Sequence, residues 1–237
     1  PGNIGSRDRV QAVARAAKAK GIVIRIGVNG GSLEKGETLT SSALKHLKLL
    51  EDEGFRDVVI SAKAANVLKT IEVYRELAQA TDCPLHLGVT EAGTLIPGAV
   101  RSSVALGILL SDGIGDTIRV SLTADPVEEI YAAKRILAAS GIRQMGPNLI
   151  SCPTCGRTKY DMIPIADEVE RRLQSCSKQI TVAVMGCVVN GPGEARAADV
   201  GIAGGQGEGL VFRKGEILYK VPQERLVDAL MDEIEKL

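Results

Sequence analysis

The first 140 residues alternate between short apolar runs and longer amphipathic segments. Runs that are apolar on both faces predict buried strands, and the amphipathic segments, several of which end at glycine, predict helices. The expected helices cover residues 6–20, 41–53, 64–79, 98–110 and 126–139, and the expected strands cover residues 22–28, 58–61, 85–90 and 117–122. Such alternation predicts a parallel sheet covered by helices and joined by right-handed crossovers.

The pattern changes after residue 142, where a small α+β domain is predicted. Its expected elements are a loop-rich entry, a helix, an apolar strand, a β-hairpin and a terminal amphipathic helix, at residues 144–156, 166–174, 180–185, 210–221 and 222–237. The glycine-rich stretch 201–209 lacks the strand-before, helix-after setting of a dinucleotide-binding loop, so we expect a flexible connection there. The domains are therefore expected to be residues 1–142 and residues 143–237.

Composition narrows the class of protein. The chain has 237 residues, of which 45% are hydrophobic and 24% are charged, enough for one barrel-sized domain or two smaller ones. A formal net charge of +0 gives no overall field toward nucleic acid or a membrane, and 3% aromatic residues without Trp disfavour base stacking. Five cysteines, an odd number, suit a reducing compartment better than a disulfide framework.

Polar side chains mark the ends of the four predicted strands. They are Arg25 with Asn29, Lys63, Glu91, and Arg119 with Ser121. Because functional groups of TIM barrels gather at the carboxyl ends of the strands, this distribution favours half of a (β/α) barrel over an open doubly wound sheet. Cations at three of these ends favour a polyanionic small ligand, most often a phosphate or diphosphate. The alternative is that each cation pairs with a local carboxylate such as Glu34 or Asp116.

Three cysteines lie in turns shaped by glycine and proline. Cys152 and Cys155 form a Cys-x-x-Cys turn, which brings two thiolates within reach of one metal. Cys187 directly follows the apolar run 180–185 and its glycine, and it can supply a third thiolate. Thiolate-rich sites select zinc, copper(I) or iron–sulfur clusters. The sequence therefore predicts a metal site whose fourth ligand has to be found elsewhere.

The residues alone do not fix that fourth ligand. His46 and His86 lie far upstream, Cys83 is interpreted as a small buried thiol, and Cys176 as a structural or incidental thiol. Glu194, after a turn close to the third cysteine, is a candidate, and its alternative role is to cap a helix N-terminus. An iron–sulfur cluster, a structural zinc ion and no metal at all remain open, in that order of preference.

The motifs closely resemble the 4-hydroxy-3-methylbut-2-enyl diphosphate synthase family of the non-mevalonate isoprenoid pathway. The resemblance extends over nearly the whole chain. The segments that carry it are residues 1–5, 24–29, 31–35, 86–93, 113–117, 152–155 and 186–195.

The resemblance implies a TIM barrel followed by a small α+β iron–sulfur domain. It implies a 4Fe–4S cluster held by Cys152, Cys155, Cys187 and Glu194. The implied reaction is the reductive dehydration and ring opening of 2-C-methyl-D-erythritol 2,4-cyclodiphosphate to 4-hydroxy-3-methylbut-2-enyl diphosphate, with electrons from flavodoxin or ferredoxin. The residues expected to hold the cyclic diphosphate are Arg25, Asn29, Lys63, Arg119 and Ser121. Glu194 and Glu91 are the candidate catalytic residues.

A family barrel has eight strands, and the pattern here matches the last four, so we expect further residues before Pro1 in the complete protein. The run 35–40 is also short for the connection it makes. The connection 141–151, stiffened by Gly146-Pro147, is short as well, and the resemblance implies a homodimer in which each cluster domain closes the barrel of its partner. A bacterial cytoplasm is the expected location, and a plastid form stays open.

Two other functions compete with this interpretation. One is a zinc-stabilised binding module fused to a βα domain, which is not an enzyme. The other is an iron–sulfur electron carrier without substrate chemistry. Glu194 and the cations at the strand ends speak against a carrier, because electron transfer alone needs neither.

Overall fold

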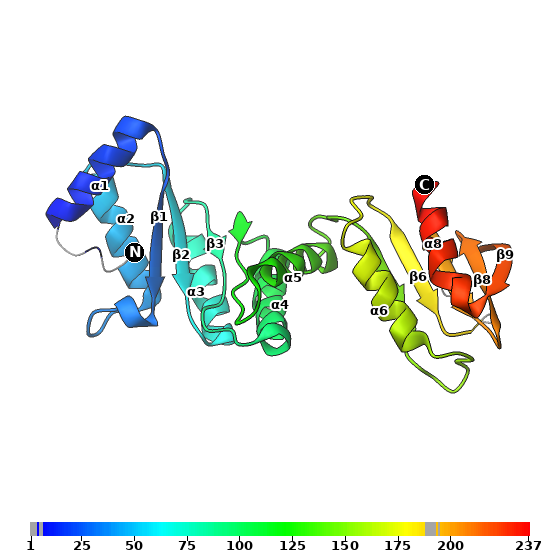
Figure 1. Ribbon diagram of the computed structural model, residues 1–237. Coiled ribbons are helices and arrows are strands. Elements are labelled where there is room, and N and C mark those ends of the chain that lie inside the picture. Colours follow the sequence, from blue (N-terminus) through cyan, green and yellow to red (C-terminus); the bar gives the residue numbers. More distant parts are fainter. Residues whose placement is uncertain (1–3, 5–6, 188–192, 194) are drawn as a thin grey trace. The chain divides into compact units, whose positions relative to one another are not determined.

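The computed structural model describes residue 4, residues 7–187, residue 193 and residues 195–237. The chain divides into two compact units, Pro1–Arg143 and Gln144–Leu237, which are described in turn (Figure 1).

The first unit contains the helices and strands that the pattern predicts. Its strands are β1 (Ile24–Asn29), β2 (Val58–Lys63), β3 (His86–Leu87) and β4 (Thr117–Ile118). Its helices are α1 (Arg7–Lys20), α2 (Leu39–Asp52), α3 (Val67–Ala80), α4 (Leu95–Ser111) and α5 (Pro126–Ala139), with the 3-10 turn η1 (Gly30–Ser32) after β1. The third and fourth strands are shorter than expected, two residues each.

The strands lie side by side in chain order. β1 pairs with β2 and β3 pairs with β4, both in parallel, and the parallel bridge between Ile60 and Leu85 joins the two pairs. Each helix from α1 to α5 contacts the next one along the chain, so the helices form one continuous layer. A doubly wound sheet would distribute them over both faces. The arrangement is an open arc of a (β/α) barrel, and the described residues form no closed barrel.

Alternation along the strands separates a helix-covered face from a polar face. Ile26, Val28, Ile60 and Ala62 are buried in the core that the helices cover. The residues between them in sequence point to the opposite face, because successive side chains of a strand alternate. That second face carries the polar and charged residues considered below.

Side-chain caps explain why two helices begin elsewhere than expected. Thr38 Oγ1 accepts a hydrogen bond from the Ser41 amide, and Ser41 Oγ accepts one from the Thr38 amide, so α2 begins two residues before the predicted position. Asn66 Oδ1 accepts from the Lys69 amide at 2.9 Å and starts α3 three residues later than predicted. The first is a reciprocal capping box and the second is a single N-cap hydrogen bond. Interactions of either kind fix the residue at which a helix starts.

The second unit is a five-stranded mixed sheet with helices on one face. Its strands are β5 (Asn148–Ser151), β6 (Thr181–Met185), β7 (Val200–Gly204), β8 (Glu208–Arg213) and β9 (Glu216–Pro222), in that spatial order. The first three are parallel and the last two antiparallel. Its helices are α6 (Met162–Leu173) and α8 (Leu226–Glu235), the latter preceded by the 3-10 turn η2 (Gln223–Arg225).

Two small cores hold this sheet. Val182, Val184 and Ile202 pack with α6 and α8 on one face. Ala183 and Met185, which alternate with them, form a second core on the other face; the further members of that core are Ala195, Ala198, Ala203 and Phe212.

The glycine-rich stretch 201–209 is not a flexible connection, and that prediction was wrong. Its first half belongs to β7, of which every residue is buried. A Cβ on Gly201 would clash with the Phe212 ring, and a Cβ on Gly204 would clash with the Tyr160 ring. The glycines are therefore there because aromatic rings lie against the strand, which leaves no room for a side chain.

Other boundaries also differ from expectation. Helix α4 begins three residues before its predicted start, and α6 begins four residues before its predicted start. The predicted loop 144–156 contains β5, which pairs in parallel with β6. Pro222 still belongs to β9, and the terminal helix begins after η2, at Leu226. The predicted hairpin around Lys214-Gly215 is confirmed as β8 and β9. In the described part of the chain, no helix is both long and apolar enough to span a bilayer.

Candidate functional site

One level of the first unit's sheet carries Asn29, Lys63, Gly88 and Arg119. Asn29 is opposite Lys63 in the β1–β2 register, and Gly88 and Arg119 directly follow the last paired residues of β3 and β4. A Cβ on Gly88 would lie 3.0 Å from the Arg119 carbonyl oxygen and 3.6 Å from Lys63 Cδ. The missing side chain of Gly88 thus gives the Lys63 and Arg119 side chains room to approach each other at the carboxyl end of the sheet.

The cations of this site repel one another. Burial, followed by the charges of Arg119 and Arg25, lowers the pKa of Lys63 from 10.5 to about 8. Within the described residues, none of the three forms an ion pair with a carboxylate. Such a group of like charges is stabilised when an anion binds between them.

Glu34 and Asp116, the carboxylates that could have paired with these cations, have other partners. Glu34 lies 2.8 Å from Lys45 Nζ, on the loop before α2. Asp116 Oδ2 accepts a hydrogen bond from the Leu85 amide at 2.8 Å and ties the ends of β3 and β4 together.

Arg25 does not lie at a strand end, and that part of the prediction was wrong. It is the second residue of β1 and pairs in register with Val59, four residues before the level of Lys63. Its charge nevertheless acts on the same groups, since it lowers the pKa of Lys63 and of His86. Its charge thus influences this group although its backbone position lies four residues from the level of Lys63.

His86 belongs to this site and the sequence interpretation missed it. The residue is 8% exposed, and Nδ1 lies 2.8 Å from Thr117 Oγ1 on the next strand. Its Nε2 and the Arg119 Nε are buried atoms without a hydrogen-bond partner among the described residues. Burial, then the charges of Arg25, Lys63 and Arg119, lower the pKa of His86 to about 4. The signal in the sequence was its position two residues before Gly88, on the same face of the strand.

Glu91 lies on the loop after β3 in a backbone conformation that few residues adopt. Its φ is 54°, in the left-handed region, and its side chain is exposed. The loop is held on both sides: the Ala92 carbonyl accepts from Arg101 Nη1 at 2.8 Å, and the Gly93 carbonyl accepts from the Thr123 amide at 2.9 Å. Strained residues kept in place by their surroundings are typical of functional sites. Ser121, two residues beyond Arg119, is half-buried.

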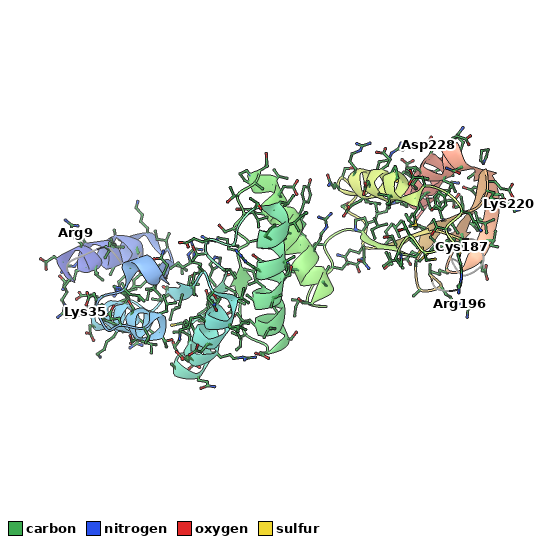
Figure 2. All side chains as sticks on the ribbon, turned by 90° about the horizontal axis from the view of Figure 1, so that it is seen from below. Arg9, Lys35, Cys187, Arg196, Lys220 and Asp228 are labelled. Carbon is green, nitrogen blue, oxygen red and sulfur yellow. The ribbon has the colours of Figure 1, made fainter. Side chains whose placement is uncertain are left out.

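In the second unit, Cys152 directly follows β5, and Cys187 lies two residues after β6, the parallel neighbour of β5. Figure 2 shows the position of Cys187 in this unit. The Gly186 amide donates a hydrogen bond to Cys152 Sγ at 2.9 Å. Cys155 is exposed, and backbone amides, that of Arg157 first, lower the pKa of its thiol. Hydrogen bonds of this kind stabilise thiolates, the form in which cysteine binds metals.

The cysteine turn packs on Gly186. A Cβ there would lie 2.7 Å from Thr158 Oγ1 and 3.1 Å from Met162 Sδ, so only glycine allows the turn to approach β6 this closely. Cys176 lies elsewhere, at the end of α6, where its amide donates to the Leu173 carbonyl and its side chain packs on the core. Cys83 packs against the core of the first unit.

The described residues contain no group of three or more His, Cys, Asp or Glu side chains close enough to hold one metal ion. Glu194 lies outside the described residues, so the predicted ligand set is not complete among them. The chemistry of the other three fits the prediction, because all are free thiols and two receive stabilising amide hydrogen bonds.

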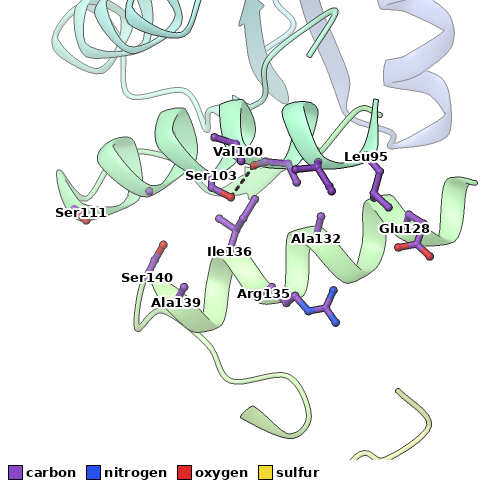
Figure 3. Close-up of a pocket in the computed structure, with 13 residues that line it drawn as sticks. Leu95, Val100, Ser103, Ser111, Glu128, Ala132, Arg135, Ile136, Ala139 and Ser140 are labelled. Atoms are coloured by element: carbon purple, nitrogen blue, oxygen red, sulfur yellow. Dashed lines mark hydrogen bonds between the residues drawn. The ribbon is translucent and has the colours of Figure 1, made fainter. Parts of the chain in front are cut away.

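The helical layer of the first unit contains a hollow of its own. It is a groove of about 670 Å³ between α4 and α5, where Ile136 and Ala132 of α5 face Val100 and Ser103 of α4 (Figure 3). Mostly small and apolar side chains line it, and none of the predicted site residues is among them. The cations lie on the other face of the strands, so this groove is a separate feature of the helical layer.

Comparison with known proteins agrees with this division of the chain. Residues 1–134 match the GcpE TIM-barrel domain, and residues 148–236 match the GcpE protein C-terminal domain. The chain belongs to the GcpE family. Its first unit is thus part of a TIM-barrel domain, as the strand order and the single helical layer indicate.

Several curated GcpE relatives are similar to the chain over its whole length. The relatives from Clostridium acetobutylicum and Clostridium perfringens are each 59% identical and that from Geobacter sulfurreducens is 56% identical. The chain covers 71%, 71% and 70% of their lengths. All three are named 4-hydroxy-3-methylbut-2-en-1-yl diphosphate synthase (flavodoxin). GcpE relatives are therefore enzymes, and membership of this family favours an enzyme over a binding module or an electron carrier.

Proposed function

We propose that this GcpE protein catalyses the reductive dehydration and ring opening of 2-C-methyl-D-erythritol 2,4-cyclodiphosphate to 4-hydroxy-3-methylbut-2-enyl diphosphate. In this reaction two electrons and two protons enter, a ring C–O bond breaks and one oxygen leaves as water. The observation that carries the proposal is the group of mutually repelling cations, Arg25, Lys63 and Arg119, without a carboxylate partner in the described residues. The names of the relatives support the same reaction.

The cations bind the diphosphate in this proposal. Lys63 and Arg119 lie at one level of the sheet, and the charge of Arg25, at an earlier position on β1, acts on Lys63 as well. Asn29, opposite Lys63, and Ser121, beyond Arg119, supply neutral hydrogen bonds to the same ligand. Charge-assisted hydrogen bonds of this kind both hold and orient a phosphate group.

The second unit holds the redox cofactor. Cys152, Cys155, Cys187 and Glu194 are the proposed ligands of a 4Fe–4S cluster. When bound, such a cluster supplies the electrons and a Lewis-acidic iron. The role of Glu194 is to be the weaker, exchangeable ligand, because a carboxylate binds such iron less firmly than a thiolate does. Reduced flavodoxin or ferredoxin is the proposed electron donor.

Glu91 is the proposed proton donor. The oxygen that leaves as water needs a proton, and Glu91 places a carboxyl group on the loop after β3, three residues beyond Gly88. Because neighbouring backbone hydrogen bonds fix that loop, the carboxyl group is held in position rather than carried on a free segment.

An anaerobic assay tests the proposed function. The complete protein is given reduced flavodoxin and the cyclodiphosphate, and the product is identified by mass spectrometry. We expect ring-opened diphosphate with the wild type and loss of turnover with Glu91→Gln, which keeps the shape of the side chain but holds no acidic proton. A protein that is reduced and binds the cyclodiphosphate but releases no product would refute the proposal.

We also propose a homodimer in which each active site draws on two chains. The test mixes subunits that carry Glu194→Ala with subunits that carry Arg119→Ala, each inactive alone. If cluster and cations of one site come from different chains, mixed dimers regain activity at the one site that has both intact. No recovery after verified subunit exchange would mean that each chain completes its own site.

A further inference from the structure

A polar residue, His86, lies next to the cations of the candidate site in the first unit. His86 is two residues before Gly88 on β3, so its side chain points to the same face as Lys63 and Arg119, one step further into the sheet. The ring is buried although it carries two polar nitrogen atoms. A buried imidazole usually has a partner for each nitrogen, and an unpartnered one calls for an explanation.

Only one of the two nitrogens is used. Nδ1 lies 2.8 Å from Thr117 Oγ1, within hydrogen-bonding distance. Nε2 is buried without a partner among the described residues. A neutral imidazole has one N–H and one lone pair. If the threonine hydroxyl donates to Nδ1, the proton is on Nε2, which is then a donor aimed at whatever fills the site.

The surroundings of the ring favour an anion as that partner. The titratable or charged groups acting on it are Arg25 from β1, Lys63 from β2 and Arg119 from β4. From the helical side, the Tyr74 hydroxyl on α3 donates to the His86 carbonyl oxygen at 2.6 Å, so the backbone of this residue is fixed as well. None of the groups acting on the ring is a carboxylate in the described part of the chain. An N–H donor surrounded by cations is directed at negative charge.

We propose that His86 is a further ligand-contacting residue of this site, and that its Nε2 donates a hydrogen bond to an oxygen of the bound diphosphate. This inference rests on the proposed function for the identity of the ligand. It adds a neutral hydrogen-bond donor two residues before the level of Lys63 and Arg119 along the strands. One end of the ligand then contacts a neutral donor, and the other end contacts the two cations. A neutral donor contributes orientation without adding to the repulsion among the cations.

Binding also changes the protonation of the ring. Without a ligand, burial and the three cations keep the pKa of His86 at about 4. A bound diphosphate offsets these positive charges, so the pKa rises and the complex takes up a proton at mildly acidic pH. A histidine remote from the bound ligand would not respond in this way, and the substitutions below separate direct contact from proximity.

Two substitutions separate ligand contact from structural support. The side-chain nitrogen of Gln occupies roughly the place of Nε2, whereas that of Asn occupies roughly the place of Nδ1. If Nε2 contacts the ligand, His86→Gln keeps the affinity for the cyclodiphosphate within about threefold, and His86→Asn weakens it about tenfold, the scale of one hydrogen bond to a charged group. If the ring only supports Thr117, Asn is the better replacement and the ranking reverses, which overturns the inference. His46→Gln is the matched control, and it leaves the affinity unchanged.

Nuclear magnetic resonance of ¹⁵N-histidine gives an independent test, because each histidine ring nitrogen has its own signal. The oxidised protein is titrated with the cyclodiphosphate without reductant, and the signals are assigned with the two Gln variants. We expect the Nε2 signal of His86 to shift and its pKa to rise by at least one unit. If the ligand binds, and Lys63→Met and Arg119→Met weaken its binding, but His86 does not respond, the inference fails and the proposed function stands. If those two variants bind as tightly as the wild type, the proposed anion site itself is wrong.

Discussion

A Cβ on Gly88 would lie 3.0 Å from the backbone carbonyl oxygen of Arg119. This distance is shorter than ordinary van der Waals contact, so Gly88→Ala forces the β3 and β4 backbones apart by a few tenths of an ångström. The same Cβ lies 3.6 Å from Lys63 Cδ and restricts that side chain. We expect Gly88→Ala to weaken cyclodiphosphate binding about tenfold and to lower the free energy of unfolding by about 1 kcal/mol.

Gly107→Ala is the matched control for this substitution. Gly107 lies within α4, and a Cβ there meets nothing within 4 Å. Alanine is the better helix former by about 1 kcal/mol, so this variant should be as stable as the wild type or more so, with the same affinity. Isothermal titration calorimetry and chemical denaturation measure the two quantities. Equal affinity of Gly88→Ala and Gly107→Ala would show that the spacing between β3 and β4 does not shape the site.

The lowered pKa of Lys63 predicts a pH dependence of binding. In the free protein this pKa is about 8, so Lys63 is protonated at pH 7 and mostly neutral at pH 9. A bound anion favours the charged form and raises the pKa. Above pH 8 the ligand therefore binds only with uptake of a proton, and affinity should fall about tenfold for each pH unit until the pKa of the complex is reached.

Lys63→Arg tests which residue is responsible for that fall. Arginine keeps its charge throughout this range, so the decrease between pH 8 and pH 10 should be absent in the variant, even if the altered head group weakens binding at pH 7. Measuring the affinity of both proteins for the cyclodiphosphate at half-unit pH intervals tests this assignment. A decrease that persists unchanged in Lys63→Arg would assign it to another group.

The sequence predicts the helices and strands of the first unit because the apolar pattern reports which face is buried. It places α2 and α3 less well, because Thr38 and Asn66 fix the helix starts by side-chain hydrogen bonds that the apolar pattern does not contain. It misjudges β7 for a different reason. The glycines there make room for the Phe212 and Tyr160 rings, which are distant in sequence, whereas a local interpretation takes glycine as a sign of flexibility.

The candidate site likewise contains residues that the sequence identifies and a residue that only the structure identifies. Lys63 is recognisable because it follows the predicted strand 58–61, and Arg119 because it is a cation within the predicted strand 117–122. The parallel register brings their positions to one edge of the sheet. The place of His86 in the site depends on two tertiary facts, the unpartnered Nε2 and the three cations around the ring. Neither is visible before the strands are paired, so a sequence interpretation considers that histidine only as a metal ligand and sets it aside.

The ligand set of the second unit predicts which cysteines a cluster needs. Cys152→Ser, Cys155→Ser and Cys187→Ser should each lose the intact cluster, seen as loss of iron, sulfide and visible absorption after anaerobic purification. Cys83→Ser and Cys176→Ser are the controls, since both thiols pack against cores and neither follows the carboxyl end of β5 or β6. Loss of the cluster in Cys176→Ser would refute the assignment.

Glu194→Cys completes this series. A fourth thiolate should keep the cluster but suppress turnover, because the exchangeable position is then closed to the substrate. Iron and sulfide content near that of the wild type, together with turnover reduced at least a hundredfold, is the expected result. Wild-type turnover in Glu194→Cys would show that the carboxylate does not have to leave.

The last prediction concerns Glu91, whose backbone is in the left-handed region at φ 54°. A residue with a Cβ is disfavoured there by roughly 1 kcal/mol or more, and Asn tolerates this conformation better than Glu does. If Glu91 is kept for its carboxyl group, Glu91→Asn should raise the free energy of unfolding by about 0.5–1 kcal/mol while abolishing turnover.

Lys214 supplies the matched control for Glu91, because its φ is 49° and it lies in the β8–β9 turn before Gly215. Lys214→Asn creates an Asn-Gly pair, which such hairpin turns favour, so it should stabilise the protein by a similar amount and leave turnover unchanged. Denaturation curves and anaerobic turnover of both variants, measured side by side, give the answer. A Glu91→Asn protein that is less stable than the wild type would mean that the carboxylate holds the loop in place, and that its role is structural rather than catalytic.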